Sequence, residues 1–561
     1  RSNIEEVNLH KGTVPVTIAF PAGFTHSLFS SVSILLELNG LTARSKFVEN
    51  FSNDISVYML YIECEDESSL PAVDNFMTQV NFLFILPRTS LFPLLEGGQL
   101  QPEEVVYAYA GWKFSYHFLN KQSDEFKLLW DELSDKPTYK DRLIRLRKRI
   151  RSEAATESRC KQAIFNNVGL IKELYADFEH HFKPRANGET PPKPVWNDEI
   201  CTKINREVGD VLDREILTAF LTLNSHLQIT NFYKRNKAAL SLRFEPSFLE
   251  NDYPEVPYAV FQFIGAEFRG FHIRFSDIAR GGIRMIKSRN EHQFLRNVEK
   301  VFDENYNLAL TQFKKNKDIP EGGSKGTILL SMAHQDKATV AFRKYIDSIL
   351  DILLAESDGD EDIVNHYDKI EYVFCGPDEG TADLMDWAAL HAKSRGYRYW
   401  TAFTTGKSES LGGIPHDRYG MTTRSVRQYV LGIMRKKGIK AQDQLKVQTG
   451  GPDGDLGSNE ILLSEDKTKV IIDGAGVLYD PQGINKEEIV RLAKARQMVD
   501  HFDRSKLTKD GFLVLLADKD VTLPDGTKVH SGMTLRNTFH LTKYAACDFF
   551  VPCGGRPESI N

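Results

Sequence analysis

The feature that most constrains the fold is an alternation of short apolar runs with a helical pattern between residues 444 and 516. An apolar run at 444–449 is followed by a glycine-rich turn, a second run at 470–473, an amphipathic stretch at 486–499 and a third run at 512–516. Short runs that alternate with helices are typical of parallel strands, because a crossover helix returns the chain to the same end of the sheet. The sequence therefore predicts a βαβ unit with a parallel sheet.

The turn after the first of these strands carries glycines where a dinucleotide can bind. Residues 450–457 read Gly-Gly-Pro-Asp-Gly-Asp-Leu-Gly, a GxxGxxG spacing instead of the usual GxGxxG. Backbone N–H groups at the start of a helix can hold a pyrophosphate, although any strand-to-helix turn can also be rich in glycine. The second strand ends at Asp473, where a carboxylate can accept hydrogen bonds from both hydroxyls of an adenosine ribose and repel a 2′-phosphate. This position favours NAD over NADP.

Length and composition set the class of the protein. With 561 residues, 41% of them hydrophobic, the chain exceeds what one core organises, and at about 150 residues per domain we expect about three or four domains. The 71 basic and 77 acidic side chains give a net charge of −6, so the chain lacks the basic excess of a nucleic-acid-binding protein. No apolar stretch approaches the ~20 residues that span a bilayer. We expect a soluble protein that binds neither nucleic acid nor a membrane.

Six cysteines are spread through the chain without a CxxC pair. The sequence therefore predicts no disulfide framework and no metal site, and it favours a reducing compartment. We expect a cytoplasmic protein, and a mitochondrial location stays open because the chain begins at Arg1 and not at a methionine.

Residues 1–100 mix strand-like and helical patterns. Runs typical of strands lie at 14–20, 55–63 and 80–86, and a helical stretch lies at 27–38. This mixture predicts a small α+β domain, in which no catalytic motif stands out.

Three further regions follow along the chain. Residues 101–230 are mainly helical and contain an exposed Pro-rich linker at 183–194. Residues 231–425 begin with strand-rich segments and contain most of the glycine-punctuated motifs, so we expect a substrate-binding domain there. Residues 426–561 hold the βαβ pattern and form the expected nucleotide domain.

Three segments of the expected substrate-binding domain carry residues suited to acid–base chemistry. The first reads Arg-Gly-Gly-Ile-Arg at 280–284, and the second reads Lys-Lys-Asn-Lys-Asp-Ile-Pro-Glu-Gly-Gly-Ser-Lys-Gly at 314–326. A lysine between glycines can lie near other cations, which lowers the pKa of its ammonium group, and a solvated lysine-rich loop is the alternative. The third segment, 375–381, follows an apolar strand with Asp378 in a tight turn, where the sites of α/β folds lie.

Together these segments resemble the glutamate dehydrogenase superfamily, and in detail its large NAD-specific class. The matching segments are, in chain order, residues 274–284, 315–326, 376–387 and 405–413. The resemblance extends over about residues 230–561. The first 200 residues have no counterpart in the small enzymes of the superfamily. In the large class such regions are regulatory or assembly domains, some of them ACT-like.

The resemblance implies roles for residues of the substrate domain. It makes Lys325 the catalytic lysine and Asp378 the carboxylate that exchanges protons at the substrate amino group. It makes Arg280 and Lys315 the two groups that hold the substrate carboxylates, and Lys314 is the alternative to Lys315. The residues that would contact the substrate are Arg280, Gly281, Gly282 and Lys315.

The resemblance also implies a set of cofactor contacts. The residues that would contact NAD are Arg418, Thr422, Gly451, Gly454, Asp455, Gly457 and Asp473. Pro452 stands where the usual fingerprint has its first glycine, so the N–H groups that hold the pyrophosphate stay open. The chain ends shortly after 548–552, which resembles a late strand of the family's nucleotide domain, and we expect this domain to be truncated here.

The resemblance implies a multidomain α/β protein with N-terminal α+β and helical regions, an α/β substrate domain and a Rossmann-like NAD domain. The implied reaction is the NAD-dependent oxidative deamination of L-glutamate to 2-oxoglutarate and ammonium by a homo-oligomer, a tetramer or a hexamer. A dehydrogenase of the same superfamily for leucine, valine or phenylalanine is one alternative, and a non-catalytic regulatory subunit is another. The presence of Lys325 and Asp378 favours an enzyme, and the several cations near Arg280 favour a dicarboxylate substrate.

Overall fold

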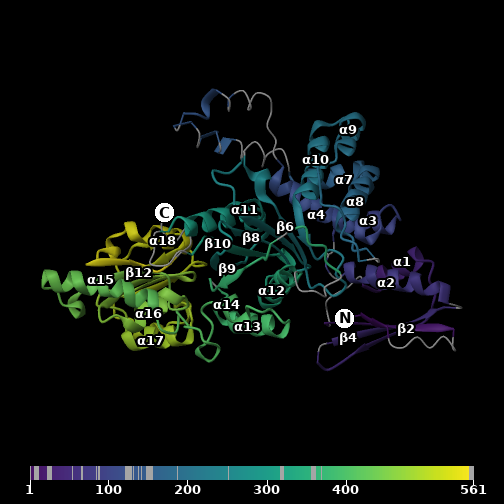
Figure 1. Ribbon diagram of the computed structural model, residues 1–561. Helices are drawn as coiled ribbons and strands as arrows, with labels where there is room; N and C mark the ends of the chain where they lie inside the picture. Colours follow the sequence, from purple (N-terminus) through teal and green to yellow (C-terminus); the bar gives the residue numbers. More distant parts are fainter. Residues whose placement is uncertain are drawn as a thin grey trace. The chain divides into compact units, whose positions relative to one another are not determined.

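The computed structural model divides the chain into two compact units, Arg1–Gly412 and Gly413–Asn561. Figure 1 shows their helices and strands. The second unit begins before the expected boundary at 426, because helix α15 (Met421–Lys437) packs against α16 (Asp455–Leu463). The structure describes residues 2–4, 12–21, 28–53, 55–64, 67–83, 85, 89–119, 129, 132–136, 138–139, 142–143, 145–146, 156–185, 188–250, 252–315, 321–355, 362–367, 369–378 and 380–554.

The first unit begins with a four-stranded antiparallel sheet in the order β1-β2-β4-β3. Alternate residues of β4 are buried, so one face of the sheet packs against two helices. This arrangement is the small α+β domain that the sequence predicts. Its elements are β1 (Ser2–Ile4), β2 (Thr13–Pro21), α1 (Leu28–Leu38), β3 (Ala43–Asn50), β4 (Ile55–Glu63) and α2 (Leu70–Leu83).

Residues 80–83 of the apolar run at 80–86 are helical and do not form a strand. Helix α2 extends to Leu83, and Val73, Phe76 and Val80 on it are buried. A spacing of three and four residues continues the apolar stripe of a helix, whereas a half-buried strand would alternate every second residue. The prediction of a strand here is wrong because these residues continue the apolar helical stripe that begins at Val73.

The next part of the first unit is helical, as the sequence predicts. Helix α4 is buried on nearly every side, and a Cβ added to its Gly111 would collide with the ring of Phe220 on α10. This close crossing gathers the helices around an aromatic core. The helices are α3 (Phe92–Glu96), α4 (Pro102–Phe118), α7 (Glu157–Asn166), α8 (Val168–Phe182), α9 (Asp198–Glu207) and α10 (Val211–His226).

A seven-stranded mixed sheet follows in the order β11-β9-β10-β8-β7-β6-β5. One face packs against α4 and α11 (Glu291–Phe313), and the other packs against α12 (Ala338–Leu354) and α13 (Met385–Ser394). Since both faces are covered, every residue of β6 and β7 is buried. The strands are β5 (Leu227–Thr230), β6 (Leu240–Phe244), β7 (Ala259–Ile264), β8 (Phe268–Arg274), β9 (Arg280–Ile286), β10 (Ser324–Leu330) and β11 (Phe374–Gly376).

The second unit contains a five-stranded sheet in the order β15-β14-β13-β12-β18. Strand β12 runs parallel to β13 and β18, with α16 directly after β12, as the βαβ pattern predicts. The elements are β12 (Leu445–Thr449), β13 (Lys467–Ile472), β14 (Gly476–Tyr479), α17 (Lys486–Ala495), β15 (Phe512–Leu515), α18 (Gly532–Thr538) and β18 (Phe549–Pro552).

The sheet of the second unit is mixed, so the prediction of a parallel sheet is wrong in one respect. Strand β14 is antiparallel to both of its neighbours, β13 and β15. The chain turns back at once after β13, because the Asp473 side chain accepts hydrogen bonds from the N–H groups of Ala475 and Gly476. A turn this tight joins antiparallel strands and leaves no room for a crossover helix.

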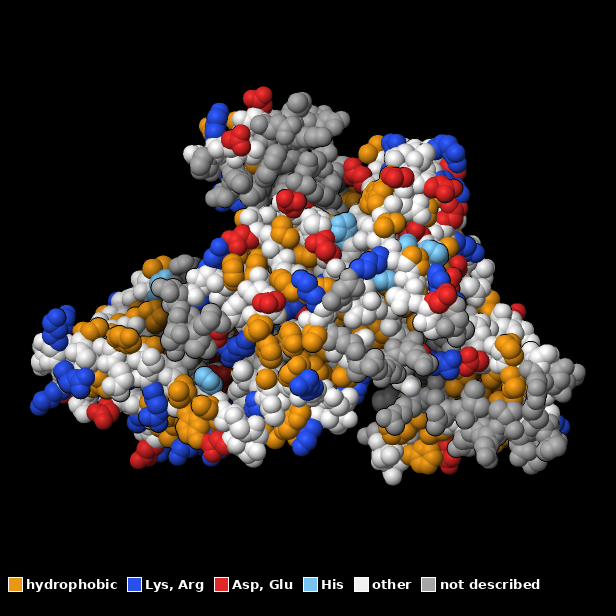
Figure 2. All heavy atoms as spheres, viewed as in Figure 1, with side chains coloured by type: hydrophobic (Ala, Val, Ile, Leu, Met, Phe, Trp, Pro, Cys, Tyr) orange, Lys and Arg blue, Asp and Glu red, His pale blue; other side chains and the backbone are white. Residues whose placement is uncertain are grey.

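Charges are mixed on the surface. On the face drawn in Figure 2, Lys and Arg side chains are interspersed with Asp and Glu and do not gather into one basic patch. Among the helices of the described residues, none has the length and apolar character needed to cross a membrane.

Candidate active site

Three adjacent strands of the first unit bring two of the predicted segments together. Strand β9 runs parallel to β10 on one side and to β11 on the other. In this register Lys325 of β10 lies beside Gly282, and Gly376 at the end of β11 pairs with Gly282 from the opposite side. Asp378 follows in the turn after β11. The glycine-flanked lysine and the carboxylate therefore approach each other over β9.

The side chains of Lys325 and Asp378 form an ion pair. Gly282 leaves the space for it, since a Cβ at this position would lie 2.9 Å from the carbonyl oxygen of Pro377 and 3.1 Å from Asp378 Cβ. The Lys325 and Asp378 side chains are 14% and 26% exposed, so the pair is mostly buried and still reachable from solvent. The two predicted catalytic groups thus meet in one place.

The surroundings of Lys325 favour its neutral form. Burial is the main cause that lowers the pKa of Lys325 to about 8, and the positive charges of Arg284 and Lys315 lower it further. The negative charge of Glu304 acts in the opposite direction and raises this pKa. A lysine with a pKa near the working pH exists in both protonation states. It can therefore both accept and donate a proton during a reaction.

Arg280, the first residue of β9, is held by two groups to which the sequence analysis gave no role. Its guanidinium forms an ion pair with Glu321 and donates to Thr405 Oγ1 from Nε at 3.1 Å and from Nη2 at 3.0 Å. The Arg280 side chain is 33% exposed, so a ligand can still reach it. Glu321 and Thr405 both lie within the motifs that carry the resemblance, which is the signal that could have identified them.

The two lysines after helix α11 differ in their contacts. Lys314 forms an ion pair with Glu255. Lys315 is exposed, donates to Gln312 Oε1 at 2.8 Å, and lies close enough to Lys325 for its charge to lower the pKa of Lys325. The geometry therefore favours Lys315 over Lys314 as a substrate-binding group. Lys317, in the same segment, lies outside the described residues.

Gly281 has a backbone role. A Cβ on Gly281 would collide with the carbonyl of Ser324, so this glycine allows β9 and β10 to approach each other at the start of the site. Gly282 makes room for the Lys325–Asp378 pair, as described above. Their predicted contact with substrate stays a prediction.

The site as a whole is positive. Arg284 forms an ion pair with Glu304 at 2.7 Å, and it lies on the same face of β9 as Arg280 because alternate residues of a strand share a face. The cations Arg280, Arg284, Lys315 and Lys325 outnumber the carboxylates Glu304, Glu321 and Asp378. An excess of cations in a partly buried site suits an anionic ligand.

The glycine turn of the second unit has the close packing that a dinucleotide site needs. A Cβ on Gly457 would collide with the carbonyl oxygen of Gly451, so the start of α16 packs directly against the turn. Gly450 has a φ of +84°, which favours glycine, and Gly454 is the N-cap of α16. The first N–H groups of α16 therefore lie directly beside a glycine-rich turn, which fits a pyrophosphate.

Asp473 lies at the end of β13, beside the glycine turn, as predicted, but its carboxylate points into the protein. The side chain is buried, and its oxygens accept hydrogen bonds from the N–H groups of Ala475, Gly476 and Val499. Burial raises the pKa of Asp473 to about 6, although these hydrogen bonds oppose the shift. Its predicted ribose contact stays a prediction.

The remaining predicted cofactor residues are exposed. Asp455, in the first turn of α16, forms an ion pair with Arg496 at 3.2 Å. Arg418 and Thr422 lie near the start of α15 in the second unit, and their roles stay predictions. Within the described parts of the chain, no group of three or more His, Cys, Asp or Glu side chains is placed to hold a metal ion.

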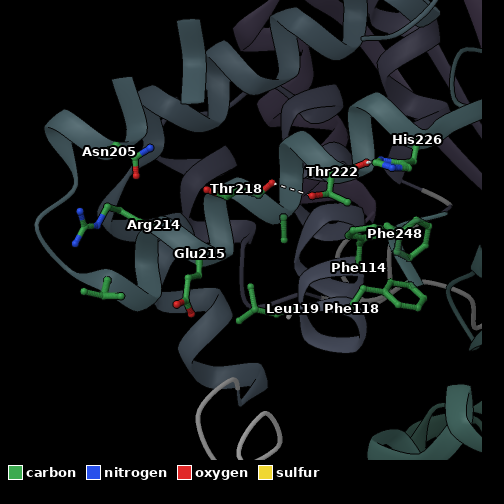
Figure 3. Close-up of a pocket in the computed structure, with 12 residues that line it drawn as sticks. Phe114, Phe118, Leu119, Asn205, Arg214, Glu215, Thr218, Thr222, His226 and Phe248 are labelled. Carbon is green, nitrogen blue, oxygen red and sulfur yellow. Dashed lines mark hydrogen bonds between the residues drawn. The ribbon is translucent and has the colours of Figure 1, made fainter. Parts of the chain in front are cut away.

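A cavity of about 460 Å³ lies between helices of the first unit, away from the predicted site residues, none of which lines it. Figure 3 shows Phe114, Phe118 and Phe248 at one end of this cavity and Asn205 and Arg214 at the other. His226 lies beside Phe248, so the end with the aromatic rings also carries an imidazole.

Comparisons with known proteins agree with the motifs. Residues 199–541 match the family described as "Bacterial NAD-glutamate dehydrogenase, catalytic domain". Residues 4–96 match "NAD-specific glutamate dehydrogenase, second domain". The chain is 51% identical over 551 residues to "Glutamate dehydrogenase 2" of Dictyostelium discoideum, an alignment that covers 97% of this chain and 52% of that protein. It is 46% identical over 564 residues to "NAD-specific glutamate dehydrogenase" of Neurospora crassa, covering 97% of this chain and 54% of that protein. The chain thus spans about half the length of these relatives.

Proposed function

The chain belongs to the NAD-specific glutamate dehydrogenases, and from this premise we propose that it carries out the NAD-dependent oxidative deamination of L-glutamate to 2-oxoglutarate and ammonium. The observation that supports this proposal most directly is the Lys325–Asp378 pair over Gly282, surrounded by an excess of cations. Such a pair provides a proton donor and a proton acceptor beside a site for an anion.

Two cations hold the substrate carboxylates in this proposal. Arg280 is fixed in direction by Glu321 and Thr405, and about a third of it is open to a ligand. Lys315 is exposed and near enough to Lys325 to influence its charge. A dicarboxylate amino acid bound between them would have its Cα and nitrogen near Lys325. Positioning of this kind contributes much of the rate of a dehydrogenase.

Lys325 and Asp378 carry the proton transfers. With a pKa near 8, Lys325 in its amine form accepts a proton from the water that attacks the imine carbon of the oxidised substrate. Asp378, paired with Lys325, exchanges protons with the substrate nitrogen as it leaves as ammonia. The partial burial of the pair strengthens these interactions by limiting bulk water.

The glycine turn of the second unit would hold NAD through Gly451, Gly454 and Gly457, whose lack of side chains lets a pyrophosphate approach the start of α16. Bound NAD supplies the acceptor for the hydride of the substrate Cα–H. A homo-oligomeric state, a tetramer or a hexamer, and a cytoplasmic or mitochondrial location remain proposals from the sequence.

A test uses the full-length protein and follows NADH absorbance with L-glutamate, norvaline, leucine and phenylalanine as substrates. Glutamate should be the preferred substrate, because an apolar side chain leaves a cation of the site without its partner. A higher kcat/KM with leucine or phenylalanine than with glutamate would show that the substrate is an apolar amino acid. Absence of turnover with every substrate would favour a non-catalytic subunit.

A further inference from the structure

A second carboxylate lies in the glycine turn beside Asp473. A Cβ on Gly451 would collide with Asp473 Oδ2 and would lie 2.7 Å from Asp453 Oδ1. Both carboxylates therefore flank the same point of the backbone. The negative charge of Asp453 also contributes to the raised pKa of Asp473. Two acidic side chains thus lie beside the glycine turn, and of these only Asp473 matches the acidic position of the usual fingerprint.

The two carboxylates differ in how deeply they are buried. Asp473 is 3% exposed and accepts three backbone hydrogen bonds, from Ala475 at 2.8 Å, Gly476 at 3.2 Å and Val499 at 2.8 Å. A carboxylate has about four acceptor positions. A ribose diol donates two hydrogen bonds, so Asp473 could accept both only by giving up a backbone partner.

The bonds of Asp473 serve the shape of the site. Those from Ala475 and Gly476 fix the turn from β13 into β14, and the one from Val499 ties the segment after α17 to the same place. Asp453, by contrast, is half-buried within the glycine turn itself, directly before the N-cap Gly454 of α16. Of the two, Asp453 is the more accessible to a ligand.

We propose that Asp453 is the carboxylate that accepts the ribose hydroxyls of the cofactor and sets the preference for NAD over NADP, with Asp473 as a positioning residue behind it. This inference rests on the proposed function, because it requires that the glycine turn hold a dinucleotide. The 2′-phosphate of NADP would add a further negative charge beside the two carboxylates in a partly buried turn, where like charges repel strongly.

The test is a fluorescence titration of the full-length protein with NADH and with NADPH, which measures binding without turnover. Asp453→Asn keeps the size of the side chain and removes its charge. It should raise the Kd for NADH about tenfold or more and lower the preference for NADH over NADPH by about the same factor, with an unchanged Tm. Asp473→Asn should lower the Tm, because it disturbs three backbone hydrogen bonds.

The matched control is Asp520→Asn, in the same unit but outside the predicted cofactor contacts, where the carboxylate is exposed and paired with His530. It should leave both Kd values within about twofold of wild type. Wild-type binding of both cofactors by Asp453→Asn would overturn the inference, and so would loss of the preference in Asp473→Asn at an unchanged Tm. If the wild-type protein binds neither NADH nor NADPH, the proposed function fails as well. If the wild type binds NADH and the Asp453→Asn variant behaves like it, only the role of Asp453 fails.

Discussion

A single methyl group on Gly282 should separate Lys325 from Asp378, the two proposed catalytic groups of the first unit. Asp378 reaches Lys325 over this glycine, and the alanine Cβ would lie 2.9 Å from the carbonyl oxygen of Pro377, 3.1 Å from Asp378 Cβ and 3.3 Å from Asp378 Oδ2. The obstacle is backbone on one side, so a change of rotamer cannot relieve it. In Gly282→Ala the turn that carries Asp378 must move away from β9.

The size of the movement and its cost follow from these distances. Ordinary van der Waals contacts of a Cβ begin at 3.4 Å, so the contact with Pro377 demands a shift of about 0.5 Å. A misplacement of about 1 Å can lower the rate by about 10²-fold. A shift of about 0.5 Å should therefore lower kcat/KM by about tenfold, which is about 1.4 kcal/mol. Overpacking of this kind also lowers the free energy of unfolding by about 1–3 kcal/mol.

The assay compares kcat/KM for L-glutamate and the Tm of the full-length wild type with those of Gly282→Ala and a control. Gly169→Ala is the control, because Gly169 lies in helix α8 of the same unit and an added Cβ there meets no atom within 4 Å. The control should keep its kcat/KM. Unchanged kcat/KM in Gly282→Ala would refute the argument that the Lys325–Asp378 pair depends on the bare backbone of β9.

Three further predictions concern the charges of the site. Lys325→Ala should lower kcat by about 10²-fold or more with NADH binding intact. Lys325→Arg should not restore kcat, because a guanidinium does not lose its proton near neutral pH. Near-normal turnover in either variant would remove Lys325 from the mechanism. The kcat/KM of the wild type should rise with pH through about 8 as Lys325 loses its proton. In Arg284→Met this rise should move to higher pH, because the charge of Arg284 lowers the pKa of Lys325; a pH profile identical to wild type would contradict this cause. Lys315→Met should lower kcat/KM for glutamate by about 10²-fold and lower kcat/KM for norvaline far less. Lys314→Met, which removes only the ion pair with Glu255, should leave both kcat/KM values nearly unchanged. Equal effects of the two variants would argue against Lys315 as the group that binds a substrate carboxylate.

The sequence by itself determined the features that depend on short stretches of chain. The alternation at 55–63 and the helical stripe at 27–38 correspond to β4 and α1, because periods of 2 and 3.6 residues follow from local backbone geometry. The ordered motifs identified the family, and the glycine-rich segment directly after a strand-like run located the turn between β12 and α16. Each of these inferences needs only residues that are neighbours in the chain.

The tertiary structure decided which groups each side chain meets. Glu321 and Thr405 hold Arg280 from 41 and 125 positions away, and Val499 binds the Asp473 carboxylate from 26 positions away. No local period encodes such pairs, because they depend on which strands and turns pack side by side. The inward carboxylate of Asp473 has the same origin, since Val499 is one of its donors. Whether a polar side chain faces a ligand or the backbone is settled only when distant segments compete for its hydrogen bonds.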